Sequence, residues 1–399
     1  MSKIINKKQK INQLLNRNVE VVIDKKHLLK KLLTSQKLRI KHGIDPTGKN
    51  IHIGRAVVLW KLREFQELGH KIILIIGDFT AQIGDPSDKL SKRPFLTENE
   101  IKQNMKNYLP QIGKILDLKK CEIHYNSQWL NKLTFKQVTK IADVFTIQQM
   151  LERRNFSERI KNHQEISLRE LLYPIMQGYD SVAIKADVEL GGSDQLFNLH
   201  AGRKIQEFFG QPPQDIITTK MLSGLDGRKM STSWGNVINI CDLPDEQYGK
   251  VMSMHDEMIP EYLELATDLK EEKIKELISL FNNQKINPKE IKKIIAFNIV
   301  SRYWGKEAAL KAEEKFEKLF SKKEIPENLP ILKIKNKKIS VLDLVLLTKI
   351  LKSKSEAWRL ILQGGFQINN QPIKNPKEMI NLKNNDIIKI GKHNFFKIN

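Results

Sequence analysis

The feature that most constrains the fold of this chain is a strand–helix–strand pattern between residues 38 and 76. The segment Leu38–Asp45 has the composition of a strand, and Pro46-Thr47-Gly48 interrupts it. Residues 54–68 then place apolar side chains on one side of a helix, and residues 71–76 form a continuous apolar run. Such a run is typical of a strand buried on both faces of a parallel sheet. The pattern is therefore a βαβ unit and predicts an α/β fold.

The remaining segments predict further domains around this unit. Residues 97–170 are polar and mostly helical in pattern, which predicts an insertion between two halves of the sheet. Near the C-terminus we expect two short helices, over 341–351 and 355–363, and short strands over 366–368, 386–390 and 395–398. The predicted organisation is an N-terminal helical segment (1–35), a Rossmann-like parallel-sheet domain (36–240) with a helical insertion at about 97–170, an α-helical domain (241–325), a linker (326–340) and a small α+β domain (341–399).

Composition excludes several classes of protein. Hydrophobic residues make up 40% of the chain, and no run of about 18 apolar residues occurs, so we expect no membrane-spanning helix. Cys121 and Cys241 lie far apart, which excludes a disulfide scaffold and a Cys-rich zinc module. The basic first residues lack the apolar core of a secretory signal. We therefore expect a cytoplasmic protein.

The positive charge is concentrated at one end of the chain. Lys and Arg number 68 and Asp and Glu 46, so the formal net charge is +22. Residues 331–399 contain 14 basic and 4 acidic residues, which gives 14 − 4 = +10 and leaves 22 − 10 = +12 for the preceding 330 residues. A uniform preference for Lys codons would spread the charge evenly. The asymmetry therefore predicts that the C-terminal segment contacts nucleic-acid phosphates.

A first candidate site follows the strand at residue 43 and reads Gly43-Ile-Asp45-Pro-Thr47-Gly-Lys-Asn-Ile-His52-Ile-Gly54-Arg55. A strand end here turns into a helix N-terminus, whose free N–H groups and partial positive charge favour phosphate. The two outer glycines allow close backbone approach. Taken alone, His52 could equally be a surface histidine at the start of a helix.

A second candidate site is Lys229-Met230-Ser231-Thr232-Ser233, which follows Gly224-Leu-Asp-Gly227-Arg228. A glycine-flanked loop that carries a lysine can close over a polyphosphate and neutralise developing charge. Five residues of this kind could also form a solvated loop.

Together the two segments resemble the HIGH and KMSKS signatures of the class I aminoacyl-tRNA synthetases. The first matches three of the four HIGH positions with His52-Ile53-Gly54, and the second matches four of the five KMSKS positions. Two departures stand out, because Arg55 replaces the second histidine and Thr232 replaces the second lysine. Arg228, just before the loop, could supply the missing positive charge.

Three segments between these signatures resemble tyrosyl-tRNA synthetases in particular. They are the pocket loop Asp78–Ser87, the helix segment Tyr173-Pro-Ile-Met-Gln177-Gly-Tyr-Asp180 and the ribose-contact segment Gly191-Gly192-Ser193-Asp194-Gln195. The spacing i, i+4, i+7 places Tyr173, Gln177 and Asp180 on one helix face, where polar side chains need partners. One difference is that many tyrosyl enzymes place a Tyr before the Gly43-Ile-Asp45 turn to help bind the phenol, whereas this chain has Lys41-His42. Phenol recognition is therefore expected to depend more on Asp180.

The resemblance implies a role for each residue of the site. Tyrosine would bind through Asp180 at its phenol, through Tyr173, Gln177 and Asp85 at its ammonium group, and through Gln195 at its carboxylate. ATP, carrying Mg²⁺ and acting as a substrate, would bind through Gly43, Asp45, Thr47, His52, Gly54, Arg55, Gly192, Asp194, Lys229, Ser231 and Thr232. Within this set His52, Lys229 and Thr232 would be catalytic. Lys89, Arg93 and Arg228 would add charge at the pyrophosphate. No metal held by the protein and no tightly bound cofactor are expected.

The resemblance extends to the last residue. Residues 341–399 are similar to the ribosomal S-four-type RNA-binding domain that ends bacterial tyrosyl-tRNA synthetases, with the helical domain on the anticodon side of the tRNA. It implies tRNA contacts by Lys352, Lys354, Arg359 and Lys392 and a homodimer formed through the insertion. Two alternatives remain. A tryptophanyl-tRNA synthetase would share the fold but typically lacks the C-terminal module, and a non-catalytic RNA-binding or splicing protein would explain the altered KMSKS loop.

Overall fold

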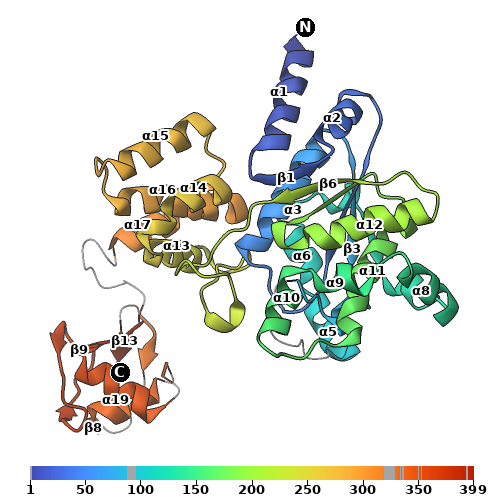
Figure 1. Ribbon diagram of the computed structural model, residues 1–399. Coiled ribbons are helices and arrows are strands. Elements are labelled where there is room, and N and C mark those ends of the chain that lie inside the picture. The colour runs from blue at the N-terminus through green and yellow to red at the C-terminus, as the bar shows by residue number, and fades with distance from the viewer. Residues whose placement is uncertain are drawn as a thin grey trace. The chain divides into compact units, whose positions relative to one another are not determined.

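The structure is a computed structural model that describes residues 2–87, 96–318, 329–332, 334, 337–348, 350–351, 353–391 and 394–399. The chain divides into two units, Met1–Glu313 and Glu314–Asn399, which are coloured from blue to orange and from orange to red in Figure 1. No helix in the described part of the chain is long and apolar enough to cross a membrane.

The first unit is built on a six-stranded sheet with the strand order β1-β6-β5-β2-β3-β4. Strand β1 is antiparallel to β6, and the other neighbouring pairs are parallel. The strands are β1 (Val19–Ile23), β2 (Arg39–Ile44), β3 (Lys71–Ile76), β4 (Glu122–Tyr125), β5 (Val188–Gly192) and β6 (Asp215–Thr219). Strand β3 is buried from Ile72 to Ile76, which confirms the prediction from its apolar run. The predicted α/β fold with a parallel sheet is therefore confirmed.

Helices pack on this sheet, and further helices make up most of the insertion. Helix α3 packs against β3 and β5, and α12 packs against β5, β6 and α11. The helices of this part are α1 (Ser2–Asn16), α2 (Lys25–Leu33), α3 (Ile53–Glu67), α4 (Thr80–Ile83), α5 (Glu98–Met105), α6 (Tyr108–Ile112), α7 (Ser127–Leu130), α8 (Phe135–Ala142), α9 (Ile147–Leu151), α10 (Arg154–Lys161), α11 (Leu168–Ile184) and α12 (Leu196–Phe208). Short 3₁₀ turns occupy Leu118–Lys120, Ser193–Gln195, Thr232–Trp234 and Asp256–Met258.

A group of five helices follows the sheet, as expected for residues 241–325. They are α13 (Pro244–Ser253), α14 (Ile259–Ala266), α15 (Glu271–Asn282), α16 (Pro288–Trp304) and α17 (Lys306–Phe316). Helix α16 packs against α13 and α14, and α14 also contacts α3, so this group adjoins the sheet part of the first unit.

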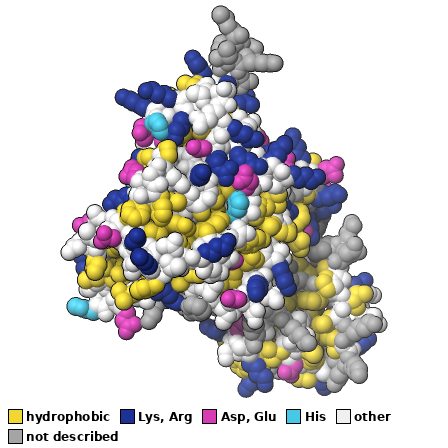
Figure 2. All heavy atoms as spheres, turned by 90° about the vertical axis from the view of Figure 1, so that its right-hand side faces the viewer, with side chains coloured by type: hydrophobic (Ala, Val, Ile, Leu, Met, Phe, Trp, Pro, Cys, Tyr) yellow, Lys and Arg dark blue, Asp and Glu magenta, His cyan; other side chains and the backbone are white. Residues whose placement is uncertain are grey.

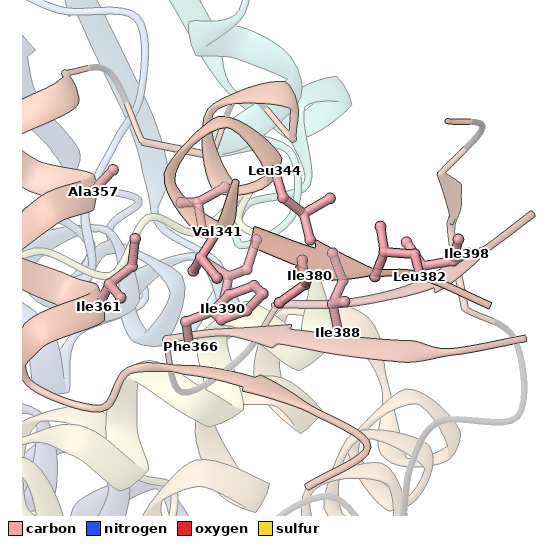
Figure 3. Packing of buried hydrophobic residues seen from close by; sticks show 11 residues of the cluster. Val341, Leu344, Ala357, Ile361, Phe366, Ile380, Leu382, Ile388, Ile390 and Ile398 are labelled. Carbon is pink, nitrogen blue, oxygen red and sulfur yellow. The ribbon is translucent and has the colours of Figure 1, made fainter. Parts of the chain in front are cut away.

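The second unit has its own apolar core around two short helices. Helices α18 (Val341–Leu347) and α19 (Lys354–Leu362) pack with strands β7 (Ile331–Leu332), β8 (Lys338–Ser340), β9 (Phe366–Ile368), β10 (Gln371–Pro372), β11 (Met379–Asn381), β12 (Ile387–Ile390) and β13 (Asn394–Ile398). Figure 3 shows the side chains of Val341, Ile361 and Phe366 turned towards those of Ile388 and Ile390. The predicted helices and strands of this small α+β domain are confirmed to within a few residues.

Three boundaries differ from the sequence prediction. Residues 1–35 are not only helical, because β1 lies between α1 and α2 and pairs with β6, far along the chain. The insertion over 97–170 contains β4, which extends the main sheet beside β3. The predicted linker over 326–340 includes β7 and β8, which pair with β13 and β11 of the second unit. Its residues 326–328 lie outside the described part of the chain.

Candidate active site

A cavity of about 470 Å³ lies at the carboxyl ends of β2, β3, β5 and β6. From β2 the chain continues to β3 on one side, whereas β5 is the neighbour of β2 on the other side. Ligands of open α/β sheets usually bind in the crevice at such a point. The lining contains every residue expected to contact tyrosine or ATP: Gly43, Asp45, Thr47, His52, Gly54, Arg55, Asp85, Tyr173, Gln177, Asp180, Gly192, Asp194, Gln195, Lys229, Ser231 and Thr232. Five separate sequence motifs therefore converge on one site.

The additional charges expected for pyrophosphate are not all at the cavity. The guanidinium of Arg228 forms an ion pair of 2.5 Å with Asp226 and lies over the ring of Trp234, and Arg228 is not among the lining residues. Lys89 and Arg93 lie outside the described residues. In the second unit, Lys354 and Arg359 are exposed on α19, whereas Lys352 and Lys392 also lie outside the described residues.

One end of the cavity is the N-terminus of α3. His52 is the N-cap residue of this helix, so the first turn of α3 opens towards the lining residues. A Cβ atom at Gly54 would lie 2.9 Å from Sδ of Met230, so α3 and the second motif approach each other closely at this glycine. Arg55 donates to Thr47 Oγ1 at 3.1 Å and to the Tyr108 hydroxyl at 3.2 Å. The end of α3 thus combines helix N–H groups with a fixed guanidinium and can bind an anion.

The lysine-bearing loop is held against this end by Asn236. The Asn236 side chain accepts from Ser231 N at 2.9 Å and donates to Lys229 O at 3.1 Å. Ile53 N donates to Ile238 O at 2.8 Å and joins the segment after the loop to the start of α3. The Lys229 ammonium lies 3.5 Å from Asp194 Oδ2, with both side chains partly exposed. This lysine is therefore placed at the cavity without being buried, as a mobile phosphate ligand requires.

The partly exposed Asp45 and the buried Tyr173 form an acid–phenol pair in the lining of the cavity. The Tyr173 hydroxyl donates to Asp45 Oδ2 at 2.8 Å, and Thr80 Oγ1 donates to Asp45 Oδ1 at 2.7 Å. Burial and the nearby Asp45 carboxylate hold the pKa of Tyr173 well above its usual value, so it remains a neutral phenol. Because its proton points to Asp45, its oxygen offers lone pairs to a cation.

Asp85 anchors a second polar group beside this pair. It accepts from Gln195 Nε2 at 2.6 Å and from the Ser87 hydroxyl at 2.7 Å. Arg153 donates to Ser87 Oγ at 2.7 Å, and Asn198 donates to Ser87 Oγ at 3.2 Å. Asp85 and Gln195, which lie far apart in the sequence, therefore meet at the cavity.

Asp180 lies in the last turns of α11 and lines another part of the cavity. It is 3% exposed, and its oxygens accept from Trp129 Nε1 at 2.7 Å and from Asn126 Nδ2 at 3.3 Å. Burial raises the pKa of Asp180 to about 7, while Lys41, Trp129 and Asn126 oppose that rise. Asn126 and Trp129 were not predicted as site residues. They follow β4, whose carboxyl end meets the same edge of the sheet, but the four half-buried residues of β4 give no strand signal in the sequence.

Lys41 and His42 face opposite sides of β2. His42 lines the cavity, and its Nδ1 bonds with Leu190 O at 2.8 Å. Burial lowers the pKa of His42, so the ring is neutral at pH 7, donates from Nδ1 and has an acceptor at Nε2. Lys41 is fully buried, is absent from the lining and forms an ion pair of 2.8 Å with Glu189. The site can thus hold an amine near carboxylates, a polar ring substituent at Asp180 and a polyanion at α3.

The chain matches the family described as tRNA synthetases class I (W and Y) over residues 6–321. It is 46% identical over 387 residues to a tyrosine–tRNA ligase of Thermotoga maritima, covering 97% of this chain and 96% of that protein. It is 45% identical to the tyrosine–tRNA ligase of Carboxydothermus hydrogenoformans, covering 97% of this chain and 97% of that protein. It is 42% identical to the tyrosine–tRNA ligase of Aquifex aeolicus, covering 94% of this chain and 95% of that protein.

Solved structures support the same fold. A C-terminally truncated mitochondrial tyrosyl-tRNA synthetase of Aspergillus nidulans matches with a TM-score of 0.63 at 21% identity, covering 80% of this chain and 99% of that chain. A tyrosyl-tRNA synthetase of Archaeoglobus fulgidus complexed with L-tyrosine matches with a TM-score of 0.62 at 24% identity, covering 77% and 99%.

Proposed function

Because the chain belongs to the class I tRNA synthetases for tryptophan and tyrosine, and within them to the bacterial-type tyrosine–tRNA ligases, we propose that its cavity holds tyrosine and ATP together for adenylate formation. The enzyme activates L-tyrosine with ATP, releases pyrophosphate and transfers the tyrosyl group to the 3′ end of its tRNA. The relatives' names favour this activity over the tryptophanyl alternative. The observation that carries the proposal for the site is the convergence of five separated motifs on one cavity.

The amino-acid end of the site is assigned from its hydrogen-bond pattern. Asp180 accepts the phenolic O–H of tyrosine, since Trp129 and Asn126 already orient its carboxylate. The Tyr173 oxygen and the Asp85 carboxylate receive the ammonium group together with Gln177, and Gln195 orients the carboxylate of the substrate. Phenylalanine would leave the Asp180 group buried and without its phenol partner, which disfavours it.

The ATP end of the site is assigned from charge and backbone. Gly192 and Asp194 hold the ribose, and the Asp194 carboxylate lies close to this turn, since a Cβ at Gly192 would be 2.9 Å from Asp194 Oδ1. Gly43 and Asp45 lie near the adenylate. Thr47, His52, Gly54 and Arg55 meet the β- and γ-phosphates at the start of α3, with Lys229, Ser231 and Thr232 closing from the loop.

Mg²⁺ enters this scheme with ATP rather than as a resident metal. The cavity carboxylates already accept from protein groups: Asp45 from Tyr173, Asp85 from Gln195, and Asp194 from Lys229. Such a donor set fits a cation that is held chiefly by substrate phosphates. The chemistry that Mg²⁺ supplies is neutralisation of phosphate charge, and the protein residues contribute positioning.

Tyrosine-dependent exchange of pyrophosphate into ATP tests the proposal directly. We expect exchange with L-tyrosine and none above background with L-tryptophan at equal concentration. Exchange with tryptophan alone would support the tryptophanyl alternative. No exchange with either amino acid at saturating ATP would support the non-catalytic RNA-binding alternative.

A homodimer is supported by an apolar surface on the insertion. Helices α8 and α11 pack together around the buried residues Ile141, Met150 and Ile175. These two helices and α9 expose large apolar side chains, which are Phe135 (84%) on α8, Ile147 (66%) on α9, and Leu168 (80%) and Leu172 (39%) on α11. Figure 2 shows a broad hydrophobic area on the face of the molecule to which α8 belongs. A surface of this kind is expected to be buried in an oligomer, and a second copy of the chain is the family expectation.

The second unit is assigned to tRNA binding in a cytoplasmic enzyme. Its net charge of +10 over residues 331–399 comes from 14 basic and 4 acidic residues, and Lys354 and Arg359 are exposed on α19. Exposed cations on a small separate unit suit contacts with a sugar–phosphate backbone. A cytoplasmic location follows from the part that the enzyme plays in translation.

A further inference from the structure

Behind the tyrosine-binding face of α11 lies a closed network of buried polar groups that the proposed roles do not use. Its centre is the ion pair between Lys41 on β2 and Glu189 on β5, whose side chains are 0% and 1% exposed. Neither residue lines the cavity. A buried ion pair contributes little to stability unless every donor and acceptor is satisfied, so its presence next to the site needs an explanation.

All three N–H groups of the Lys41 ammonium have acceptors. They are Glu189 Oε1 at 2.8 Å, the Gln177 backbone carbonyl at 2.8 Å and the Ser181 hydroxyl at 2.7 Å. Two of these acceptors belong to α11, one turn apart. Lys41 on β2 therefore links the turn of α11 from Gln177 to Ser181 to the sheet.

The Glu189 carboxylate is equally occupied. Oε1 accepts from Lys41 and from Gln177 Nε2 at 3.2 Å, and Oε2 accepts from Ser181 Oγ at 3.1 Å and from Gln214 Nε2. An ionised carboxylate is only an acceptor. The group that Gln177 turns towards Glu189 must therefore be its NH₂, and the opposite orientation of the amide would set two acceptors against each other.

We infer that Glu189, held by Lys41, is a positioning residue that fixes the side-chain amide of Gln177 so that its carbonyl oxygen accepts from the substrate ammonium group. The inference rests on the proposed role of Gln177 in binding tyrosine. The amide of a glutamine can rotate to present either end, and a site that selects for an amine must prevent this rotation. A buried carboxylate behind the amide does so without touching the substrate.

The test uses Glu189→Gln, which keeps the shape but lets residue 189 donate as well as accept. Dissociation constants are measured for L-tyrosine, for tyramine, which keeps the amine but lacks the carboxylate, and for 3-(4-hydroxyphenyl)propionate, which lacks the amine. We expect the variant to bind L-tyrosine and tyramine about tenfold more weakly, the loss of roughly one net hydrogen bond. Binding of the propionate should change by less than about twofold, because it makes no contact through the Gln177 oxygen.

Two further variants separate positioning from folding. Lys41→Met combined with Glu189→Gln removes both buried charges together, which is tolerated far better than removing one, and should give the same pattern of affinities. Glu170→Gln is the matched control, because Glu170 lies on α11 and, like Glu189, is in a fully buried ion pair, here with Arg159. It should leave the ratio of tyramine to propionate affinity as in the unaltered enzyme.

The outcomes are distinct. Equal weakening of all three ligands, or no weakening of any, in the folded double variant would overturn the inference. If instead the unaltered enzyme showed no tyrosine-dependent exchange, the proposed function itself would fail before the variants were compared.

Discussion

Asp180 shows how burial and hydrogen bonding act in opposite directions on one carboxyl group. Burial raises its pKa from the ordinary 3.8 to about 7, while Lys41, Trp129 and Asn126 favour the ionised form. The group is therefore balanced between its two states near neutral pH. Only the carboxylate is a strong acceptor for a phenolic O–H.

The first prediction follows from this balance. Below pH 7 the Asp180 carboxyl group is mostly protonated in the free enzyme, and above pH 7 it is mostly ionised. The KM for tyrosine in pyrophosphate exchange should therefore fall about tenfold as the pH rises from 6 to 8. Asp180→Asn should raise this KM and abolish its dependence on pH, while the KM for ATP stays within about twofold. A steep pH dependence that survives in Asp180→Asn would assign the titration to another group.

The second prediction concerns the loop that contains Lys229 and Thr232. The Lys229 side chain is partly exposed at the cavity, and its ammonium lies 3.5 Å from Asp194 Oδ2 on the side where the phosphates are proposed to bind. Lys229→Ala should lower the adenylation rate constant by about 10²-fold or more and change tyrosine affinity little, because the contact is made in the transition state. Single-turnover measurements with equilibrium tyrosine binding separate the two effects. Thr232→Lys should leave the rate equal or higher, and a large loss would mean that the loop is built around a neutral residue.

The residues of the site were predictable where chemistry and strand ends coincide. Asp45 directly follows β2 and Asp194 follows β5, and the carboxyl ends of parallel strands meet at one edge of a sheet. The partners of Asp180 were not predictable, because Trp129 and Asn126 belong to a polar insertion without a motif. Which of Lys41 and His42 faces the cavity also depends on the register of β2, which the sequence alone leaves open.

At the scale of elements, the packing of α11 on α12 positions Tyr173, Gln177 and Asp180, which are proposed to bind tyrosine. A Cβ at Gly178 would lie 2.6 Å from Cδ1 of Ile205 and 3.2 Å from the backbone of Ala201, so the two helices meet only because residue 178 is glycine. The preceding residue, Gln177, lines the cavity. The contact between the helices is thus part of the site.

The third prediction tests that contact. Gly178→Ala should force α11 away from α12, lower the free energy of unfolding by about 1–3 kcal/mol and raise the KM for tyrosine. Gly249→Ala on α13 is the control, because nothing lies within 4 Å of its Cβ position, and it should stabilise the chain by about 0.5–1 kcal/mol. Denaturant midpoints at constant slope measure both. Equal stability of the two variants would show that the helices can separate at no cost.

Elements were predicted well where the signal is local and poorly where it depends on distant pairing. The apolar run of β3 and the helix after His52 are visible in the sequence because their patterns are continuous. Strand β1 has a mixed burial pattern and acquires its structure by pairing with β6, nearly two hundred residues away. Strand β4 has four half-buried residues at the edge of the sheet, so its pattern is too short to stand out from the helices around it.

At the scale of the whole molecule, the apolar surface over α8 and α11 yields the fourth prediction. Phe135→Lys combined with Leu168→Lys should convert a dimer into monomers, because both side chains are more than three-quarters exposed in one copy and would meet the partner. Leu310→Lys on α17, where the side chain is 57% exposed, is the control and should leave the mass unchanged. Sedimentation equilibrium gives the masses. A monomeric unaltered chain at micromolar concentration would contradict the proposed homodimer.

The last prediction concerns the division of the chain into two units. Every cavity-lining residue belongs to the first unit, whereas the concentrated positive charge belongs to the second. A chain that ends after Lys318, with α17 complete, should therefore make tyrosyl-adenylate at close to the full-length rate but charge tRNA poorly. Full-length binding of tRNA should weaken steeply with salt, and Arg359→Ala should flatten the log–log slope by about 0.7–0.9, the value of one phosphate contact, while pyrophosphate exchange stays unchanged. Filter binding over a range of salt concentrations measures the slope. If the shortened chain kept the tRNA affinity and salt slope of the full chain, the basic residues of the second unit would have no part in binding tRNA.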